Sequence, residues 1–172
     1  PLAFVDGRPA AGILSDGAFN FRHRSAGINY HRGRANAVSK ALLCHDFLSQ
    51  DIVIDEPIDL TDADAVANAV IENPKCASCH QALDPMASFF WVNKPNWGAG
   101  QIVFPLEFHV PHRSDVWQTA TGRAPGYFGL GGSTMNQLGP LIAADPRFAQ
   151  CTARRYFAHL AQVDPKAIDF GT

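Results

Sequence analysis

Two cysteines and a histidine fall within five residues of one another near the middle of the chain. Residues 76 to 80 read Cys-Ala-Ser-Cys-His, a C-x-x-C-H pattern. Thiols three positions apart on one helical turn can each form a thioether with a vinyl group of the same porphyrin, and the adjacent histidine can then bind the iron. The sequence therefore predicts one covalently attached c-type haem, bound through Cys76 and Cys79, with His80 as an iron ligand.

The C-x-x-C pattern also occurs in redox-active dithiols and in zinc sites. A thioredoxin-like dithiol follows a strand of a βαβ unit, whereas a helical pattern precedes Cys76 here. A zinc site needs a second pair of ligands, but Cys44 and Cys151 stand alone and no two histidines are four positions apart. Both alternatives are weaker than haem attachment.

The remaining two cysteines, Cys44 and Cys151, offer one possible disulfide. Both fall on the apolar stripes of expected helices, so they could instead be buried as small apolar side chains. A c-type haem is assembled in an oxidising compartment such as the bacterial periplasm, where a disulfide would also persist. We therefore expect a periplasmic or extracellular location.

The sixth ligand of the iron is predicted to be Met135. The chain has two methionines, and Met86 lies only six residues after His80, so it would have to turn sharply to reach the opposite porphyrin face. Met135 follows a glycine-rich loop and precedes the closing helix. The alternatives are His109 or His112, which would give a bis-histidine iron, an open sixth site, and a Met135 that only fills the core.

Composition argues against several other classes of function. The 172 residues carry a net charge of -2, which provides no broad basic surface for nucleic acid. No run approaches the ~18 to 20 apolar residues that a membrane-spanning helix needs. The sequence opens without a basic and apolar leader, so we expect a removed secretory signal or a piece of a larger protein.

The elements before the motif position it from the N-terminal side. Residues 1–30 read as an irregular arm with one short helical turn around Ile13–Ala18. Apolar spacings of three and four predict a helix over Arg34–Leu48, and an extended connector follows at Asp51–Leu60. A second helix is expected over Asp62–Glu72, ending before Pro74.

The elements after the motif begin with a strand. Apolar residues on even positions predict a strand or hairpin over Ile102–Val110, with Glu107 and His109 on a polar face in water. Thr119–Gly132 is glycine-rich and reads as a loop. Helices are predicted over Met135–Ala144 and Pro146–Ala161.

Four segments resemble a known family in order along the chain. They are Arg8–Leu14, the Arg32-Gly33 helix start leading to Cys44, CASCHQALDP at Cys76–Pro85, and AADPRFAQC at Ala143–Cys151. This pattern resembles the haem-binding C-terminal domains of large secreted cytochromes known from planctomycetes and related bacteria. The chain departs from the family pattern just after the motif, at Met86 and Ala87 and at Phe89–Val92, and again over Pro95–Gly132.

The resemblance implies a mainly α fold with a class I cytochrome c-like core. The helices Asp62–Glu72 and Pro146–Ala161 would pack across each other around the motif, and the strand or hairpin would be a small insertion. Residues 1–50 would form an arm and a helix packed on this core from outside, and residues 51–172 would form the monohaem domain.

The expected function is electron transfer, as a carrier or relay subunit outside the cytoplasm with redox protein partners, within a larger complex or parent protein. One alternative is a haem enzyme, peroxidase-like or nitrogen-oxide-converting, with an open sixth site. Another is a structural haem subunit of a larger complex. Arg123, with Trp91, Trp97 and Tyr127 nearby, is a candidate partner for the haem propionates, and His45 is expected to be a structural helix residue.

Overall fold

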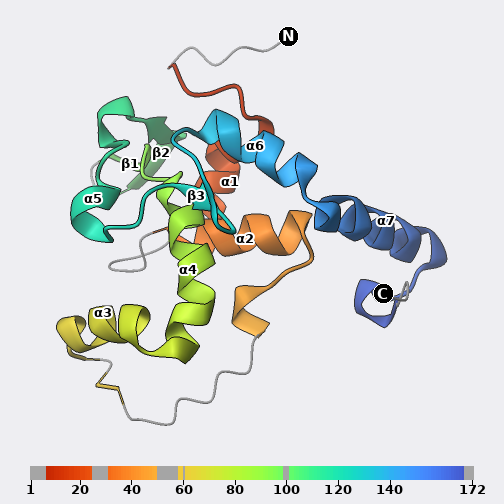
Figure 1. Ribbon diagram of the computed structural model, residues 1–172. Helices are drawn as coiled ribbons and strands as arrows, with labels where there is room; N and C mark the ends of the chain where they lie inside the picture. Colours follow the sequence, from red (N-terminus) through yellow and green to blue (C-terminus); the bar gives the residue numbers. More distant parts are fainter. Residues whose placement is uncertain (1–6, 25–30, 50–57, 60, 99–100, 169–172) are drawn as a thin grey trace.

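Helices make up most of the described chain, as the sequence predicts. The computed structural model describes residues 7–24, 31–49, 58–59, 61–98 and 101–168 (Figure 1). Within these residues two short antiparallel hairpins accompany the helices. No described helix combines the length and apolar character needed to cross a bilayer. The fold is therefore mainly α.

The N-terminal arm is more regular than the sequence predicts. A 3-10 turn, η1 (Gly12–Ser15), leads into a short helix, α1 (Gly17–Arg22), whose first turn is capped by the Asp16 side chain. Asn20 is fully buried and donates to the carbonyl of Leu14 at 2.9 Å. Its side-chain oxygen accepts from Asn93 at 3.1 Å. The first hydrogen bond lies within the arm, and the second joins the arm to the body of the molecule.

The helix that begins the core, α2 (Arg32–Leu42), ends six residues before the predicted end at Leu48. Cys44 has a left-handed backbone, with φ of 53°, which a helix cannot continue through. The Ser39 hydroxyl donates to the His45 carbonyl at 2.7 Å. Asn36 accepts from the Phe47 amide at 2.8 Å, at the start of the 3-10 turn η3 (Phe47–Ser49). These contacts stabilise a chain reversal.

Two consecutive helices, α3 (Ala63–Glu72) and α4 (Pro74–Ser88), meet at Asn73. Asn73 is the C-cap of α3, and its side chain accepts from the amides of Lys75 and Cys76, so it also caps α4. Pro74 at the first helical position suits the same start. The motif thus lies at the beginning of a helix of its own, which the predicted boundary before Pro74 anticipates.

The core forms where α2, α4 and α6 (Met135–Ala144) meet. Ala35 and Val38 of α2 are completely or almost completely buried, as are Met86 of α4 and Leu138 of α6. We expected the first helix to pack on the core from outside. Instead, α2 supplies part of the core itself.

The strand prediction agrees with β2 (Gln101–His109), which pairs antiparallel with β1 (Asn93–Gly98). The side chains of residues 94–108 lie outside the description, and with them the position of Glu107 on a polar face that the sequence predicts. The predicted loop after it contains the end of α5 (Trp117–Ala120) and a second small hairpin. The elements between β2 and α6 are η4 (Pro111–Arg113), which precedes the predicted loop, then α5, β3 (Gly126–Tyr127) and β4 (Leu130–Gly131).

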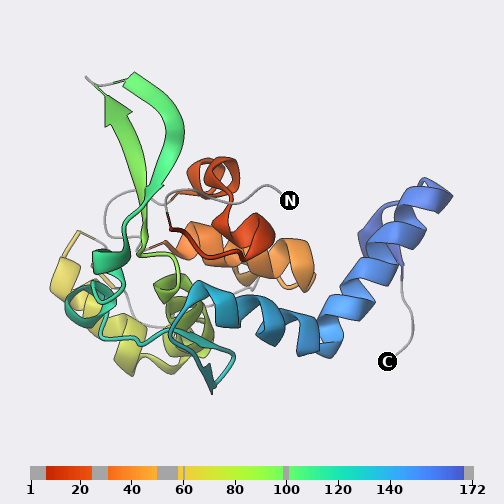
Figure 2. The ribbon, with the colours of Figure 1, turned by 90° about the horizontal axis from the view of Figure 1, so that it is seen from above.

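The last two helices follow the predicted boundaries. α6 begins after Thr134, whose amide donates to the Gln137 side chain, and α7 (Pro146–Ala161) begins after the N-cap Asp145. A final 3-10 turn, η5 (Pro165–Ala167), follows. However, α3 and α7 lie at opposite ends of the molecule in both views (Figures 1 and 2). The predicted packing of these two helices is wrong, and α7 contacts α2 instead.

The two cysteines predicted to pair, Cys44 and Cys151, lie at disulfide-bonding distance with 5.3 Å between their Cα atoms. Cys151 is buried on α7, as expected. Cys44 lies in the turn after α2 rather than on the helix stripe. The pair joins the end of α2 to α7 across 107 residues of sequence.

Candidate functional site

The residues of the C-x-x-C-H motif lie on the first turns of α4. Cys76, Cys79 and His80 are separated by three and four positions, a spacing that puts side chains on one side of a helix. The two thiols are free and half-buried. Two unbonded thiols and one imidazole therefore share one side of a single helix.

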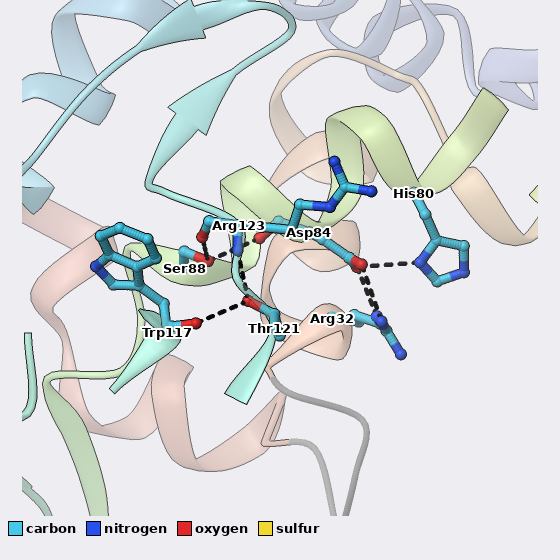
Figure 3. A network of polar contacts seen from close by, with 7 residues as sticks. All are labelled: Arg32, His80, Asp84, Ser88, Trp117, Thr121 and Arg123. Atoms are coloured by element: carbon cyan, nitrogen blue, oxygen red, sulfur yellow. Dashed lines mark hydrogen bonds and ion pairs between the residues drawn. The ribbon is translucent and has the colours of Figure 1, made fainter. Parts of the chain in front are cut away.

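One ring nitrogen of His80 has a defined partner. Its Nδ1 lies 3.0 Å from Oδ1 of Asp84, one turn further along α4 (Figure 3). The Nε2 atom has no hydrogen-bond partner among the described residues. His80 is partly exposed, with 23% of its side chain accessible, so Nε2 can reach a bound group.

Asp84 is held in turn by Arg32, the first residue of α2. The guanidinium donates from Nε to Oδ1 at 2.6 Å and from Nη2 to Oδ2 at 2.9 Å. Burial opposes ionisation of Asp84, but the hydrogen bonds from His80 and Arg32 outweigh it and lower the pKa of the carboxyl. Asp84 is thus a buried carboxylate shared between a histidine and an arginine.

The C-terminal half of α4 brings Arg123 to the same side. Ser88 donates to the Arg123 carbonyl at 2.7 Å, and the Arg123 amide donates to Thr121 at 3.2 Å. In Figure 3 the Arg123 side chain extends from this loop toward Asp84 and His80. Its guanidinium has no ion-pair partner among the described residues, so it is available to an anionic group.

A small cleft of about 120 Å³ lies between α3 and these polar residues. One wall carries Val66 and Val70 of α3, and the opposite wall carries Arg32, Asp84 and Arg123. No side chain of α3 is fully buried. The apolar face of α3 therefore lies across a narrow cleft from Arg32 and Arg123.

A larger cleft of about 580 Å³ borders Cys79 on another side of α4. Ala82 continues its α4 wall, and Phe47 and Phe128 face it from η3 and the β3–β4 hairpin. The two phenyl rings are stacked with centroids 5.9 Å apart. This volume is within the ~300 to 1,000 Å³ typical of small-molecule pockets.

His45 lines the larger cleft, which sequence reasoning missed. Its ring lies edge-on to Phe47 at 4.6 Å and to Phe128 at 5.8 Å. Burial and the nearby Arg147 lower the pKa of His45, while Asp46 raises it, with a net decrease. The sequence predicts a helix through His45, so no sequence signal indicates the turn that brings His45 to this cleft.

The structure places the candidates for the sixth ligand in different surroundings. Met135, the first residue of α6, is buried in the core cluster against which Cys79 packs. Met86 is fully buried on the motif helix itself. His112 is exposed in η4, and His109 ends β2 half-buried, not on an open polar face, with no partner for Nδ1 among the described residues.

Of the residues suggested for the propionates, Arg123 alone lies beside the His80–Asp84 pair. Tyr127 donates to Asp145 at 2.7 Å, and Trp91 meets the His31 ring edge-on at 4.6 Å. The side chain of Trp97 lies outside the described residues. Arg32, which the sequence identifies only as part of a helix start, is the second cation of the site.

The donor set fits a covalently bound haem better than a bare metal ion. The described residues contain no group of three or more His, Cys, Asp or Glu side chains arranged around a metal position. Two free thiols lie beside an imidazole whose second nitrogen has no partner among these residues, which is the set of groups that thioether attachment and binding of the iron would need. No protein-family model matches the sequence, and searches of curated proteins and of solved structures find no similar protein.

Proposed function

We propose that this chain is a monohaem c-type electron-transfer protein that works outside the cytoplasm. Thioethers to Cys76 and Cys79 would hold the haem, with His80 and Met135 as its axial ligands. The observation that carries the proposal is the placement of two free thiols and an imidazole on one side of α4. The other two cysteines already lie at disulfide distance from each other.

A bound haem would supply one reversible electron at the iron. Cys76 and Cys79 would hold it through thioether bonds, and His80 and Met135 would bind its iron. His80 presents a ring nitrogen that has no partner in the part of the chain that the structure describes. Met86 lies six residues along the same helix as His80, about 9 Å along its axis, so it cannot approach from the opposite face. Met135 comes from a different helix, which makes it the better candidate.

The clefts beside α4 support binding of a large apolar group with two carboxylates. The aromatic walls at Phe47 and Phe128 suit a porphyrin ring, and the adjacent volume is about 580 Å³. Arg123 has no ion-pair partner among the described residues and suits a propionate. The apolar side of α3, including Val66 and Val70, could cover another part of the ring.

The cysteine pair supports a location in an oxidising compartment. A disulfide between Cys44 and Cys151 persists in the periplasm or outside the cell, and c-type haem is attached there as well. We propose a class I cytochrome c-like arrangement in which α2, rather than α3, packs against α7. The partners would be redox proteins, within a larger complex or parent protein.

The proposal is tested by producing the chain in a bacterial periplasm with haem attachment machinery and recording its spectrum. We expect a reversible one-electron change and a reduced spectrum that carbon monoxide alters only slowly. Rapid carbon monoxide binding would contradict electron transfer as the main role and favour the haem-enzyme alternative. A colourless protein would contradict haem binding altogether.

A further inference from the structure

The His80–Asp84–Arg32 chain is the most completely bonded group of charges at the site. The Asp84 side chain is only 3% accessible, and each of its oxygens accepts at least one hydrogen bond. Oδ1 accepts from both His80 and Arg32, at 3.0 and 2.6 Å. A buried carboxylate is costly without such partners, so its position is tightly specified.

The geometry also fixes which nitrogen of His80 carries the proton. An ionised carboxylate only accepts hydrogen bonds, so Nδ1 of His80 must be the donor. The neutral ring then has its lone pair on Nε2, which has no partner among the described residues. Side chains four positions apart on a helix are neighbours, so α4 itself sets this contact.

We propose that Asp84 is the positioning residue of the haem site: it orients His80 with Nε2 toward the iron and lowers the reduction potential by strengthening His80 as a ligand. This inference rests on the proposed function. Hydrogen bonding of a ligating histidine to a carboxylate fixes the ring and raises the basicity of the ligand. A more basic ligand favours the ferric state, because that state carries the larger positive charge.

Arg32 counteracts the effect of the Asp84 carboxylate on His80. Its two hydrogen bonds draw negative charge of Asp84 away from His80 and hold the carboxylate in one orientation. Arg32 begins α2, whose N-terminus also favours an anion. Removing Arg32 should therefore strengthen the Asp84–His80 hydrogen bond, whereas removing the charge of Asp84 should weaken it.

The test compares Asp84→Asn with Asp145→Asn in the intact haem protein. Asp145 is also paired with an arginine, Arg147, and with Tyr127, but has no contact with His80. Two quantities are measured: the midpoint potential, and the iron–histidine stretching band of the ferrous haem after photolysis of its carbon monoxide complex. We expect Asp84→Asn to raise the potential and shift the band to lower frequency, and Asp145→Asn to leave the band in place.

A charge near the haem changes the potential through space, but only a change in the ligand itself moves the iron–histidine band. An unchanged band in a folded, haem-loaded Asp84→Asn protein would overturn the inference while leaving the proposed function intact. A wild-type chain without covalent haem would overturn the proposed function instead. If Asp84→Asn fails to fold, Arg32→Gln provides the test: an upward shift of the band supports the inference, and an unchanged or lower band contradicts it.

Discussion

The hydroxyl of Ser88, on the last turn of the motif helix, donates to the backbone carbonyl of Arg123, 35 residues further along the chain, at 2.7 Å. The same hydroxyl proton is shared with the Asp84 carbonyl, which accepts at 3.0 Å. The first contact connects α4 to the loop that carries the Arg123 guanidinium. The position of Arg123 therefore depends on a buried serine of α4 as well as on the local contact between its amide and Thr121.

Replacing Ser88 by alanine should destabilise the protein by about 1 to 2 kcal/mol, because the hydrogen bond between the buried Ser88 and the Arg123 carbonyl is lost. Denaturant unfolding of the haem protein measures the change. Ser49→Ala in η3 is the matched control, since the exposed Ser49 hydroxyl donates to the Asp46 carbonyl in water. That control should change stability by less than about 0.5 kcal/mol. Equal effects of the two substitutions would contradict the assigned role of Ser88.

The Cys44–Cys151 pair should leave no titratable thiol in the denatured, unreduced haem protein, since the other two cysteines would be thioethers. Closing a loop across 107 residues stabilises by up to ~4 to 5 kcal/mol in the chain-entropy model, and often by less in practice. The double variant Cys44→Ser, Cys151→Ser should show this loss in denaturant unfolding. Two titratable thiols in the wild-type protein would contradict the bridge.

The burial of His31 should make the free energy of unfolding fall at acid pH. Burial, with Arg34 and Arg113 nearby, lowers the pKa of His31 to about 3. The unfolded chain binds a proton at this residue near pH 6.5 and the folded chain does not, so stability falls as the pH decreases from about 6.5 toward 3. The slope from this one group is at most about 1.4 kcal/mol per pH unit.

The His31→Asn variant tests this dependence, since asparagine tolerates the left-handed backbone found at this position, with φ of 66°. Unfolding at pH 7 and pH 5 should show a smaller loss of stability in the variant than in the wild type. The exposed His159→Asn on α7 is the control and should keep the wild-type difference. An identical pH dependence in His31→Asn and the wild type would show that His31 is not buried in its neutral form.

The sequence predicts those parts of the fold whose signals are local. Asp145-Pro146 begins α7 because an N-cap and a proline at the first helical position act within a few residues. The reversal at Cys44 depends on Asn36 and Ser39 bonding residues beyond the helix end, which apolar periodicity does not reveal. The helix predicted to end at Leu48 therefore ends at Leu42.

In the candidate site, too, local contacts can be predicted from the sequence and long-range contacts cannot. The spacing of His80 and Asp84 on one helix is visible in the sequence, although its meaning was missed. Arg32 lies 52 residues from Asp84, and His45 reaches the larger cleft only through a turn. These contacts arise from the packing of α2 against α4, which no local pattern encodes.

The sixth ligand can be identified by substitution at the two methionines. Methionine ligation should give the oxidised protein a weak band near ~695 nm and a higher potential than bis-histidine ligation. Met135→Ala should abolish the band and open the iron to added ligands. Met86→Leu, a nearly volume-conserving change in the core, should retain it. A spectrum unchanged by Met135→Ala would exclude Met135 and make His112 and His109 the next residues to replace.

Covalent attachment of the haem at Cys76 and Cys79 is tested most directly by acid-acetone extraction of the purified protein. A thioether-bound haem stays on the precipitated polypeptide, whereas a haem held only by iron ligands passes into the solvent. We expect the wild-type colour to remain with the protein, and the double variant Cys76→Ser, Cys79→Ser to lose any haem it binds. Colour that leaves the wild-type polypeptide would contradict the account.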